Sequence, residues 1–293
     1  MMGVLLGGII LSSTMLINKI LFSITTIIDD VKKIEKGNLK HRIENRYNTK
    51  GINELIITLN EMLERIDSGF EKISQFTSDV SHELKTPLTA IKGLIEVELI
   101  KNRSAEEYKE ALIKIVEETN WLISIVNDLL FMTKIESDSE NKIFEKVDLN
   151  EVISEIVDLL SLYAEERGVK LIFKKKSLIH INGDEGKIKR MILNLISNAI
   201  KYNKDNGIVE IKCEEDNEEI SIVVKDNGIG IKPENLEKVF ERFYREDKIR
   251  TSKQSGSGLG LSLANLIAIH HGGKINLDSI EGKGTEVSVK FPK

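Results

Sequence analysis

One apolar face runs through the middle of this 293-residue chain and constrains its fold more than any other feature. Its residues recur at steps of three, four or seven, which is typical of one buried face of a long helix. They are Ile66, Phe70, Ile73, Val80, Leu84, Leu88 and Ile91. The spacing predicts one continuous rod, and a single rod cannot bury such a face by itself.

His82 lies off this face. It is two residues from both Val80 and Leu84, so its imidazole should meet solvent or a visiting partner. A single helical histidine is more often an ordinary surface or core residue, so its neighbours matter. Glu83 could hold the Nδ1 proton and leave Nε2 as a nucleophile. Pro87 removes a backbone donor and should bend the helix one turn later.

A second helix is expected after Asn102, because Ser104 and Glu107 form a capping box. Two helices joined by a short turn make a hairpin, which cannot bury both apolar faces alone. Two copies should therefore pair into a four-helix bundle, which predicts a homodimer. A monomeric hairpin packed on the next domain is the alternative. The second apolar face comprises Tyr108, Ala111, Leu112, Ile115, Leu122, Ile125, Val126 and Leu129.

Composition narrows the class of protein. With 41% apolar and 30% charged residues, the chain has room for several domains with a real core. The net charge of −5 gives no general basic footprint, so no nucleic-acid partner is expected. Cys213 is the only cysteine, which excludes an internal disulfide and fits a reducing cytoplasm. Three prolines and 5% aromatic residues favour long helices over an all-β fold.

The segment 2–22 contains no acidic residue and one cation, Lys19. A membrane span needs about 20 apolar residues, so a transmembrane helix in contact with membrane lipid is predicted. A signal peptide and a buried core helix are the competing interpretations. Against a signal peptide, no basic residue precedes the apolar run, and the chain continues amphipathically.

Two helix-patterned stretches follow, on either side of the loop 37–51. Each apolar face is narrow, as in a coiled coil. With Glu35–Leu39 and Asn53–Leu55, the segment resembles a HAMP signal-relay module, a parallel helical bundle in dimers. The two faces are Ile24, Ile27, Ile28, Val31 and Ile34, then Leu55, Leu59, Met62 and Ile66.

Beyond a polar stretch at 137–147, a plausible linker, the pattern changes to mixed helix and strand. This mixture predicts a two-layer α/β sandwich. Helices are expected at 150–167, 184–203, 233–242 and 259–270, and strands at 169–173, 208–214, 219–225, 274–280 and 286–290. The whole chain then divides into a transmembrane helix (1–22), a HAMP-like relay (23–66), a dimerisation hairpin (67–136), the linker (137–147) and the sandwich domain (148–293).

Asn194, Asn198 and Lys201 fall at steps of four and three on the helix 184–203, and so share one face. Asparagine is a weak helix former, so this alignment is unusual for a purely structural helix. A carboxamide oxygen suits a Mg²⁺ ion that keeps several waters and bridges phosphates. A solvated polar face is the plainer interpretation.

Two glycine-rich stretches accompany this helix. Asp226–Gly230 directly follows a strand, where an ordinary turn is the simplest interpretation. The Asp226 carboxylate could instead accept the amine of adenine, while the glycines let the base approach. Ser255–Leu261 opens a helix, whose N-terminal N–H groups favour a polyphosphate. Phe240–Arg245 lies between them and supplies cations.

The run Ser81–Leu88 closely resembles the phosphoacceptor motif of sensor histidine kinases. The stretches 194–199, 226–230, 240–245 and 255–261, in this order, resemble the ATP-binding boxes of the same family. Related gyrase, chaperone and mismatch-repair ATPases lack the phosphoacceptor. The resemblance implies a bacterial membrane protein with cytoplasmic kinase domains, which phosphorylates His82 from ATP. It also implies transfer of the phosphoryl group to an aspartate on the receiver domain of a response regulator.

The resemblance also assigns roles to residues. It implies that Asn194 holds Mg²⁺, that Asp226 contacts adenine, and that residues 244–258 form a lid. Thr86 would orient a water for regulator dephosphorylation. The catalytic set is His82, Glu83 and Thr86. The nucleotide-binding set is Asn194, Asn198, Lys201, Tyr202, Asp226, Gly228, Gly230, Arg245, Gly256, Gly258, Leu259 and Gly260.

Two functions from other classes compete with this one. A scaffold could keep the fold and only dimerise at the membrane. A plain ATPase of the wider superfamily would bind the nucleotide without a phosphoacceptor. Transfer of label from the γ-phosphate of ATP to the protein separates them from the kinase.

Overall fold

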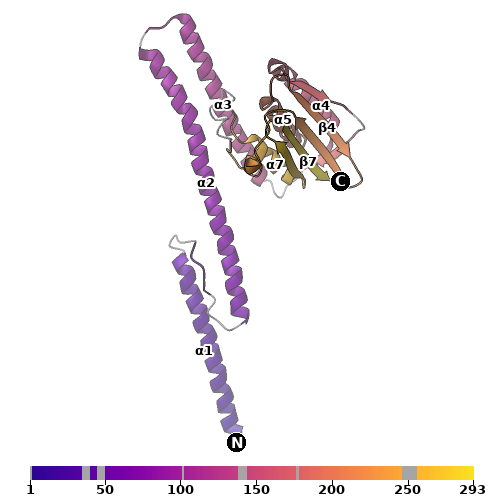
Figure 1. Cartoon of the computed structure of the whole chain (residues 1–293). Helices are drawn as coiled ribbons and strands as arrows, with labels where there is room; N and C mark the ends of the chain where they lie inside the picture. The colour runs from indigo at the N-terminus through magenta and orange to yellow at the C-terminus, as the bar shows by residue number, and fades with distance from the viewer. Residues whose placement is uncertain are drawn as a thin grey trace. The chain divides into compact units, whose positions relative to one another are not determined.

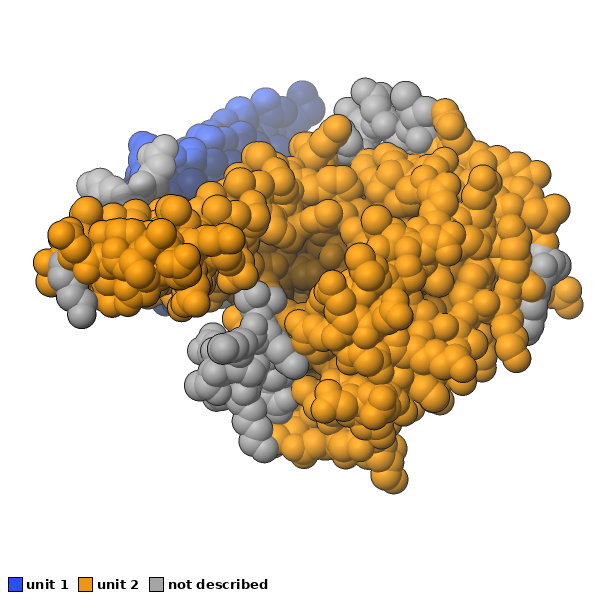
Figure 2. Space-filling view, turned by 90° about the horizontal axis from the view of Figure 1, so that it is seen from above, with its two compact units in different colours: residues 1–81 blue, residues 82–293 orange. Residues whose placement is uncertain are grey.

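The computed structural model divides the chain into two units, residues 1–81 and 82–293 (Figure 2). The boundary falls within the long helix α2 (Lys50–Ile100). The residues that the structure describes are 2–34, 40–44, 50–100, 102–137, 144–175, 178–245 and 256–293.

In the first unit, α1 (Met2–Ile34) and the first part of α2 run in the same direction (Figure 1). The Asn60 side chain fixes the segment between them: it accepts from the Ile43 N–H and donates to the Ile43 carbonyl, both at 3.0 Å. A small core surrounds this point and consists of Ile27, Ile43, Ile52, Ile56 and Leu63, with Leu59 packed against it. This is a helix–connector–helix arrangement; its assignment to the HAMP family stays a prediction.

The stretch Leu5–Lys32 of α1 is long and apolar enough to cross a membrane, judged by length and composition. Apart from Ile27, which belongs to the small core, its described large apolar side chains are exposed, among them Leu6, Ile9 and Phe22. A core helix of a soluble domain would bury such side chains. The structure therefore gives no support to the buried-core interpretation of this segment.

The predicted rod is confirmed, because α2 continues for 51 residues and passes through Pro87. After a short turn, α3 (Ala105–Ser137) begins with the predicted capping box. The Ser104 N–H donates to the Glu107 carboxylate at 2.8 Å, and the Glu107 N–H donates to Ser104 Oγ at 3.2 Å. Hydrogen bonds to the Glu107 carboxylate, first from the Ser104 backbone and then from the Ser104 and Arg103 side chains, hold the pKa of Glu107 below its usual range.

The remainder of the second unit is a two-layer α/β sandwich, as predicted. Its five-stranded sheet has the order β2-β4-β5-β7-β6, and only β2 and β4 pair in parallel. Alternate residues of the central strands are buried, for example Ile211 and Ile222, because helices cover one face of the sheet (Figure 1). The helices are α4 (Leu149–Glu166), α5 (Glu185–Lys201) and α7 (Gly260–His270); the strands are β2 (Lys170–Phe173), β4 (Ile208–Glu215), β5 (Glu219–Asp226), β6 (Lys274–Ile280) and β7 (Gly284–Pro292).

Two short strands were not predicted from the sequence. They are β1 (Glu145–Asp148) and β3 (His180–Gly183), which pair in an antiparallel two-stranded sheet. The first begins inside the segment expected to be a linker. Each strand has only four residues, too few for an alternating pattern to stand out.

The prediction of a helix at 233–242 is wrong. Two 3₁₀ turns lie there, η1 (Pro233–Asn235) and η2 (Lys238–Phe240). Their hydrogen bonds span three residues, as from Glu241 N–H to the Lys238 carbonyl at 2.9 Å. Phe243 then adopts a φ of 62° and donates its N–H to the Gly258 carbonyl at 3.1 Å. This long-range contact overrides the local helical preference.

Candidate nucleotide site

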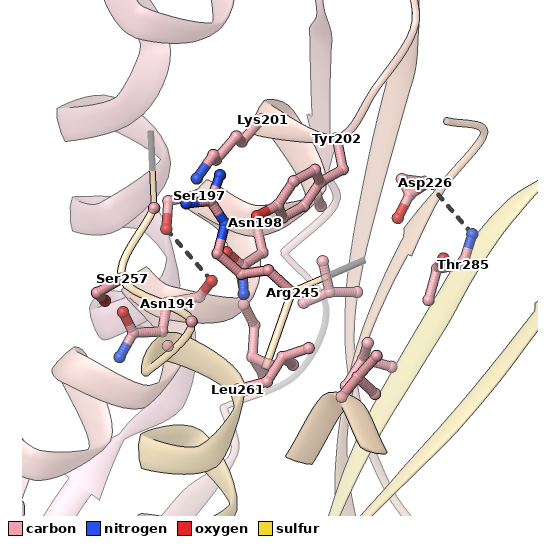
Figure 3. Close-up of a pocket in the computed structure, with 18 of the residues that line it drawn as sticks. Asn194, Ser197, Asn198, Lys201, Tyr202, Asp226, Arg245, Ser257, Leu261 and Thr285 are labelled. Carbon is pink, nitrogen blue, oxygen red and sulfur yellow. Dashed lines mark hydrogen bonds between the residues drawn. The ribbon is translucent and has the colours of Figure 1, made fainter. Parts of the chain in front are cut away.

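A cavity of about 480 Å³ lies in the second unit between α5, the sheet and the segment that leads into α7. Figure 3 shows Asn194 and Ser257 on one side of it and Asp226 with Thr285 on the opposite side. Most of the predicted nucleotide-binding residues line this cavity: Asn194, Asn198, Lys201, Tyr202, Asp226, Gly230, Arg245, Gly256, Gly258 and Gly260.

Two members of the predicted set do not line the cavity. The Gly228 N–H donates to the Asp226 carboxylate, so it orients a lining residue instead. Leu259 is fully buried in the core. The predicted lid at 244–258 falls largely on residues 246–255, which lie outside the described part of the chain.

The geometry of α5 explains its polar face. Asp184 caps the helix by accepting from the Lys187 N–H at 3.0 Å, and the opposite face packs Ile192, Ile196 and other apolar residues into the core. Asn194 is thereby turned to the cavity. Its Nδ2 is buried, and no acceptor for it is found among the described residues. A buried donor without an acceptor is costly, so this atom fits an oxygen-rich ligand, and its amide oxygen suits Mg²⁺.

Asp226 ends β5 and is held by two backbone donors, of which Figure 3 shows the one from Thr285. The N–H groups of Gly228 and Thr285 donate to Oδ1 at 2.8 Å and 3.2 Å. Burial raises the pKa of Asp226 above its usual value, and the two hydrogen bonds offset this only in part. No hydrogen bond to Oδ2 is found among the described residues. This oxygen can therefore accept an N–H from a ligand base.

Two glycines allow the chain to pass close to its neighbours. Gly258 has a φ of +70°, and a Cβ there would lie 2.7 Å from the Phe243 backbone. A Cβ at Gly256 would run into the Lys201 amino group. Gly258 is therefore required by the backbone, whereas a side chain at position 256 would displace the Lys201 amino group from its place in the site.

Lys201 is the most perturbed cation of the site. Its amino group lies 5.0 Å from the centre of the Tyr202 ring. Burial, together with the nearby Arg245 and Arg167, lowers the pKa of Lys201 to about 8. Burial also raises the pKa of Tyr202. A cluster of buried positive charge of this kind is relieved by a polyanion.

Nucleotide binding should therefore take up a proton at a pH just above 8. Free Lys201 is then largely neutral, while a bound polyphosphate favours its charged form and raises its pKa. Calorimetry of a non-hydrolysable ATP analogue in buffers of different ionisation enthalpy should detect up to about one proton. Lys201→Arg should abolish the uptake, since a guanidinium stays charged, and exposed Lys204→Arg should not. Undiminished uptake in Lys201→Arg would contradict the assignment.

The predicted phosphoacceptor lies on α2. His82 is exposed, as expected from its position off the apolar face. The Thr86 hydroxyl donates to the His82 carbonyl at 3.2 Å. The structure describes no hydrogen bond between Glu83 and the imidazole, so the role of Glu83 stays a prediction. His82, Glu83 and Thr86 are not among the described residues that line the cavity.

Some cavity residues are absent from the predicted set. Arg190 sits one helical turn before Asn194, so the same spacing extended backwards could have found it. Tyr163 comes from α4. Trp121, Ser124 and Asp128 come from α3, and no local pattern ties that helix to a nucleotide.

Two known protein families match the chain, one over the helices that carry His82 and one over the domain that holds the cavity. Residues 72–138 match the His Kinase A (phospho-acceptor) domain. Residues 183–293 match the histidine kinase-, DNA gyrase B- and HSP90-like ATPase. A phosphoacceptor hairpin followed by this ATP-binding fold defines the kinases of two-component systems. The chain belongs to the sensor histidine kinases.

Several named proteins are similar to the chain. The histidine-protein kinase ArlS of Staphylococcus haemolyticus is 34% identical over 92% of the chain and 59% of its own length. Sensor histidine kinase CusS of Escherichia coli is 30% identical over 92% of the chain and 56% of its own length. The chain thus spans a little over half of these relatives. Histidine kinase ThkA, solved in complex with response regulator protein TrrA, aligns with a TM-score of 0.64 at 26% identity over 80% of the chain and 65% of the solved one.

Proposed function

We propose that the chain phosphorylates itself on His82 from Mg²⁺-ATP and passes the phosphoryl group to an aspartate on a response regulator. The observation that carries this proposal is the combination, in one chain, of an exposed His82 in a phosphoacceptor helix and a cavity lined by most of the predicted nucleotide-binding residues. In the first step, Nε2 of His82 forms a bond to the γ-phosphorus while the bond to the ADP oxygen breaks. Such transfer needs in-line placement and charge neutralisation more than covalent help.

The residues of the cavity fit these needs. Lys201 and Arg245 supply positive charge near the transferring group. Oδ2 of Asp226 accepts the amine of adenine. Asn194 holds the magnesium ion, which would neutralise phosphate charge when bound. Glu83 holds the imidazole in the tautomer that leaves Nε2 free.

We further propose that the active form is a homodimer. One apolar face of α3 remains exposed in a single chain, with Leu112, Val116, Ile123 and Leu130 on it. On α2, Leu88 is also exposed. A second copy would cover these side chains in a four-helix bundle. Packing of α3 on α7 leaves them open, so a monomeric hairpin does not satisfy them.

The membrane and the regulator complete the proposal. Helix α1 would anchor the chain in lipid, with the kinase domains on the cytoplasmic side. Two observations support this arrangement: the exposed apolar side chains of α1, and the similarity to proteins named as sensor kinases. The response regulator as partner is supported by the likeness to ThkA, which was solved with one.

Regulator dephosphorylation should depend on Thr86 and autophosphorylation should not. The Thr86 hydroxyl is exposed one turn from His82, and it donates to the His82 backbone carbonyl and not to the imidazole. Thr86→Ala should keep labelling of the chain within a few-fold, yet slow dephosphorylation of the cognate regulator by about 10²-fold. Thr89→Ala, which removes the same kind of exposed hydroxyl one turn further on, is the control. Equal loss of both activities would make Thr86 a packing residue.

The kinase is separated from its alternatives by incubating the chain with ATP labelled at the γ-phosphate. The kinase yields labelled protein and then labelled receiver domain. Hydrolysis of ATP without labelled protein would identify a plain ATPase. Binding or dimerisation without either reaction would identify a scaffold.

A further inference from the structure

Helix α3, from the dimerisation hairpin, forms one wall of the nucleotide cavity. Trp121, Ser124 and Asp128 line it together with Asn194 of α5. The three α3 residues follow one another at steps of three and four, so they share one side of the helix. A ligand that fills the cavity would therefore touch the hairpin as well as the ATP-binding domain.

Two ion pairs hold this wall in place. Asp128 pairs with Arg190, which lies one turn before Asn194 on α5. Glu136, two turns further along α3, pairs with Arg242. The Asp128 side chain is only 7% exposed, so removal of its partner would leave a buried carboxylate uncompensated.

The same side of α3 is also apolar and buried. Ile125, Met132 and Ile135 share the helical face of Asp128, and their exposure is 0%, 2% and 3%. The exposed apolar face of α3, with Val116, Ile123 and Leu130, is distinct from it. The hairpin therefore carries one face for its own ATP-binding domain and another for a second copy.

The cavity wall also contains unmade hydrogen bonds. The indole N–H of Trp121 on α3 is buried, and no acceptor for it occurs in the described ranges. The same holds for Nδ2 of Asn194 on α5. Buried donors are nearly always paired in native proteins. Two such donors among the residues around one cavity fit a ligand that is rich in oxygen acceptors.

We propose that α3 is part of the nucleotide site, and that bound nucleotide contacts Trp121 and Ser124 while Asp128 and Arg190 keep the two domains docked. This inference rests on the proposed function for the identity of the ligand. Because coupling is reciprocal, nucleotide binding and docking of the hairpin stabilise each other.

Trp121 is the only tryptophan in the chain, so intrinsic fluorescence reports on this wall directly. Titration of the full chain in detergent with the non-hydrolysable analogue AMPPNP and Mg²⁺ should change the emission of Trp121. Asp128→Lys, which sets two cations against each other, should weaken analogue binding about tenfold and remove the change in emission. The swapped pair, Asp128→Lys with Arg190→Glu, should restore most of both signals.

Two further variants distinguish loss of docking from misfolding. Glu136→Lys reverses the charge of the half-exposed partner of Arg242. It should weaken binding of the analogue a few-fold without disturbing the core. Glu117→Lys, an exposed acid on the same helix, should behave as wild type. Wild-type affinity in both Asp128→Lys and Glu136→Lys, or an unchanged Trp121 emission at saturation, would overturn the inference and leave the proposed function standing. A wild-type chain that does not bind the analogue would overturn both.

Discussion

His82→Gln should reduce acid-labile, base-stable labelling of the chain to background. The substitution removes the nucleophilic Nε2 but leaves the cavity intact, since His82 is not among the described residues that line it. Affinity for AMPPNP should stay within about twofold, well below the effect expected from loss of a contact in the site. Labelling is measured with ATP carrying γ-³²P, and affinity by calorimetry on the same preparation.

His41→Gln is the matched control. His41 is exposed and belongs to the first unit, so its loss should leave labelling unchanged. Label that persists in His82→Gln, or that vanishes equally in His41→Gln, would remove His82 from the reaction.

Asn194→Asp should lower the initial rate of autophosphorylation by about hundredfold or more. The change places a negative charge beside the phosphates and alters the ligand offered to magnesium. The fold should persist, because the opposite face of α5, with Ile192 and Ile196, makes the core contacts. Rates are compared at saturating ATP over a range of Mg²⁺ concentrations, with far-ultraviolet circular dichroism as the check on folding.

Asn182→Asp provides the control for this charge change. Asn182 is exposed on β3, away from the lining of the cavity, and its replacement should leave the rate near that of wild type. A near-normal rate in Asn194→Asp would show that this amide does not serve the metal or the phosphates.

Long periodic elements could be predicted from the sequence because their information is local. The apolar steps from Ile66 to Ile91 predict the rod of α2, and the Ser104–Glu107 capping box predicts the start of α3. The face of Asn194, Asn198 and Lys201 on α5 was predicted in the same way and does line the cavity. In each case the residues that decide the structure lie within a few turns of one another.

Features decided by distant contacts could not be predicted. The segment 233–242 has helical spacing, but pairing of Phe243 with Gly258 draws it into 3₁₀ turns. The strands β1 and β3 are too short to carry a pattern and exist because they pair with each other over a long sequence separation, 38 residues for Glu145 with Gly183. The wall of α3 depends on Asp128 and Arg190, which are 62 residues apart.

The central claim is tested most directly by mapping the phosphoryl group on the wild-type chain after a brief reaction with Mg²⁺-ATP. Cleavage after lysine releases the peptide 73–85, in which His82 is the only histidine. Fragmentation that preserves phosphoramidates should place the group on His82. A phosphoryl group on Ser81 of the same peptide, or on Thr86 of the next one, would contradict the account, as would a peptide that stays unmodified in a chain that binds ATP.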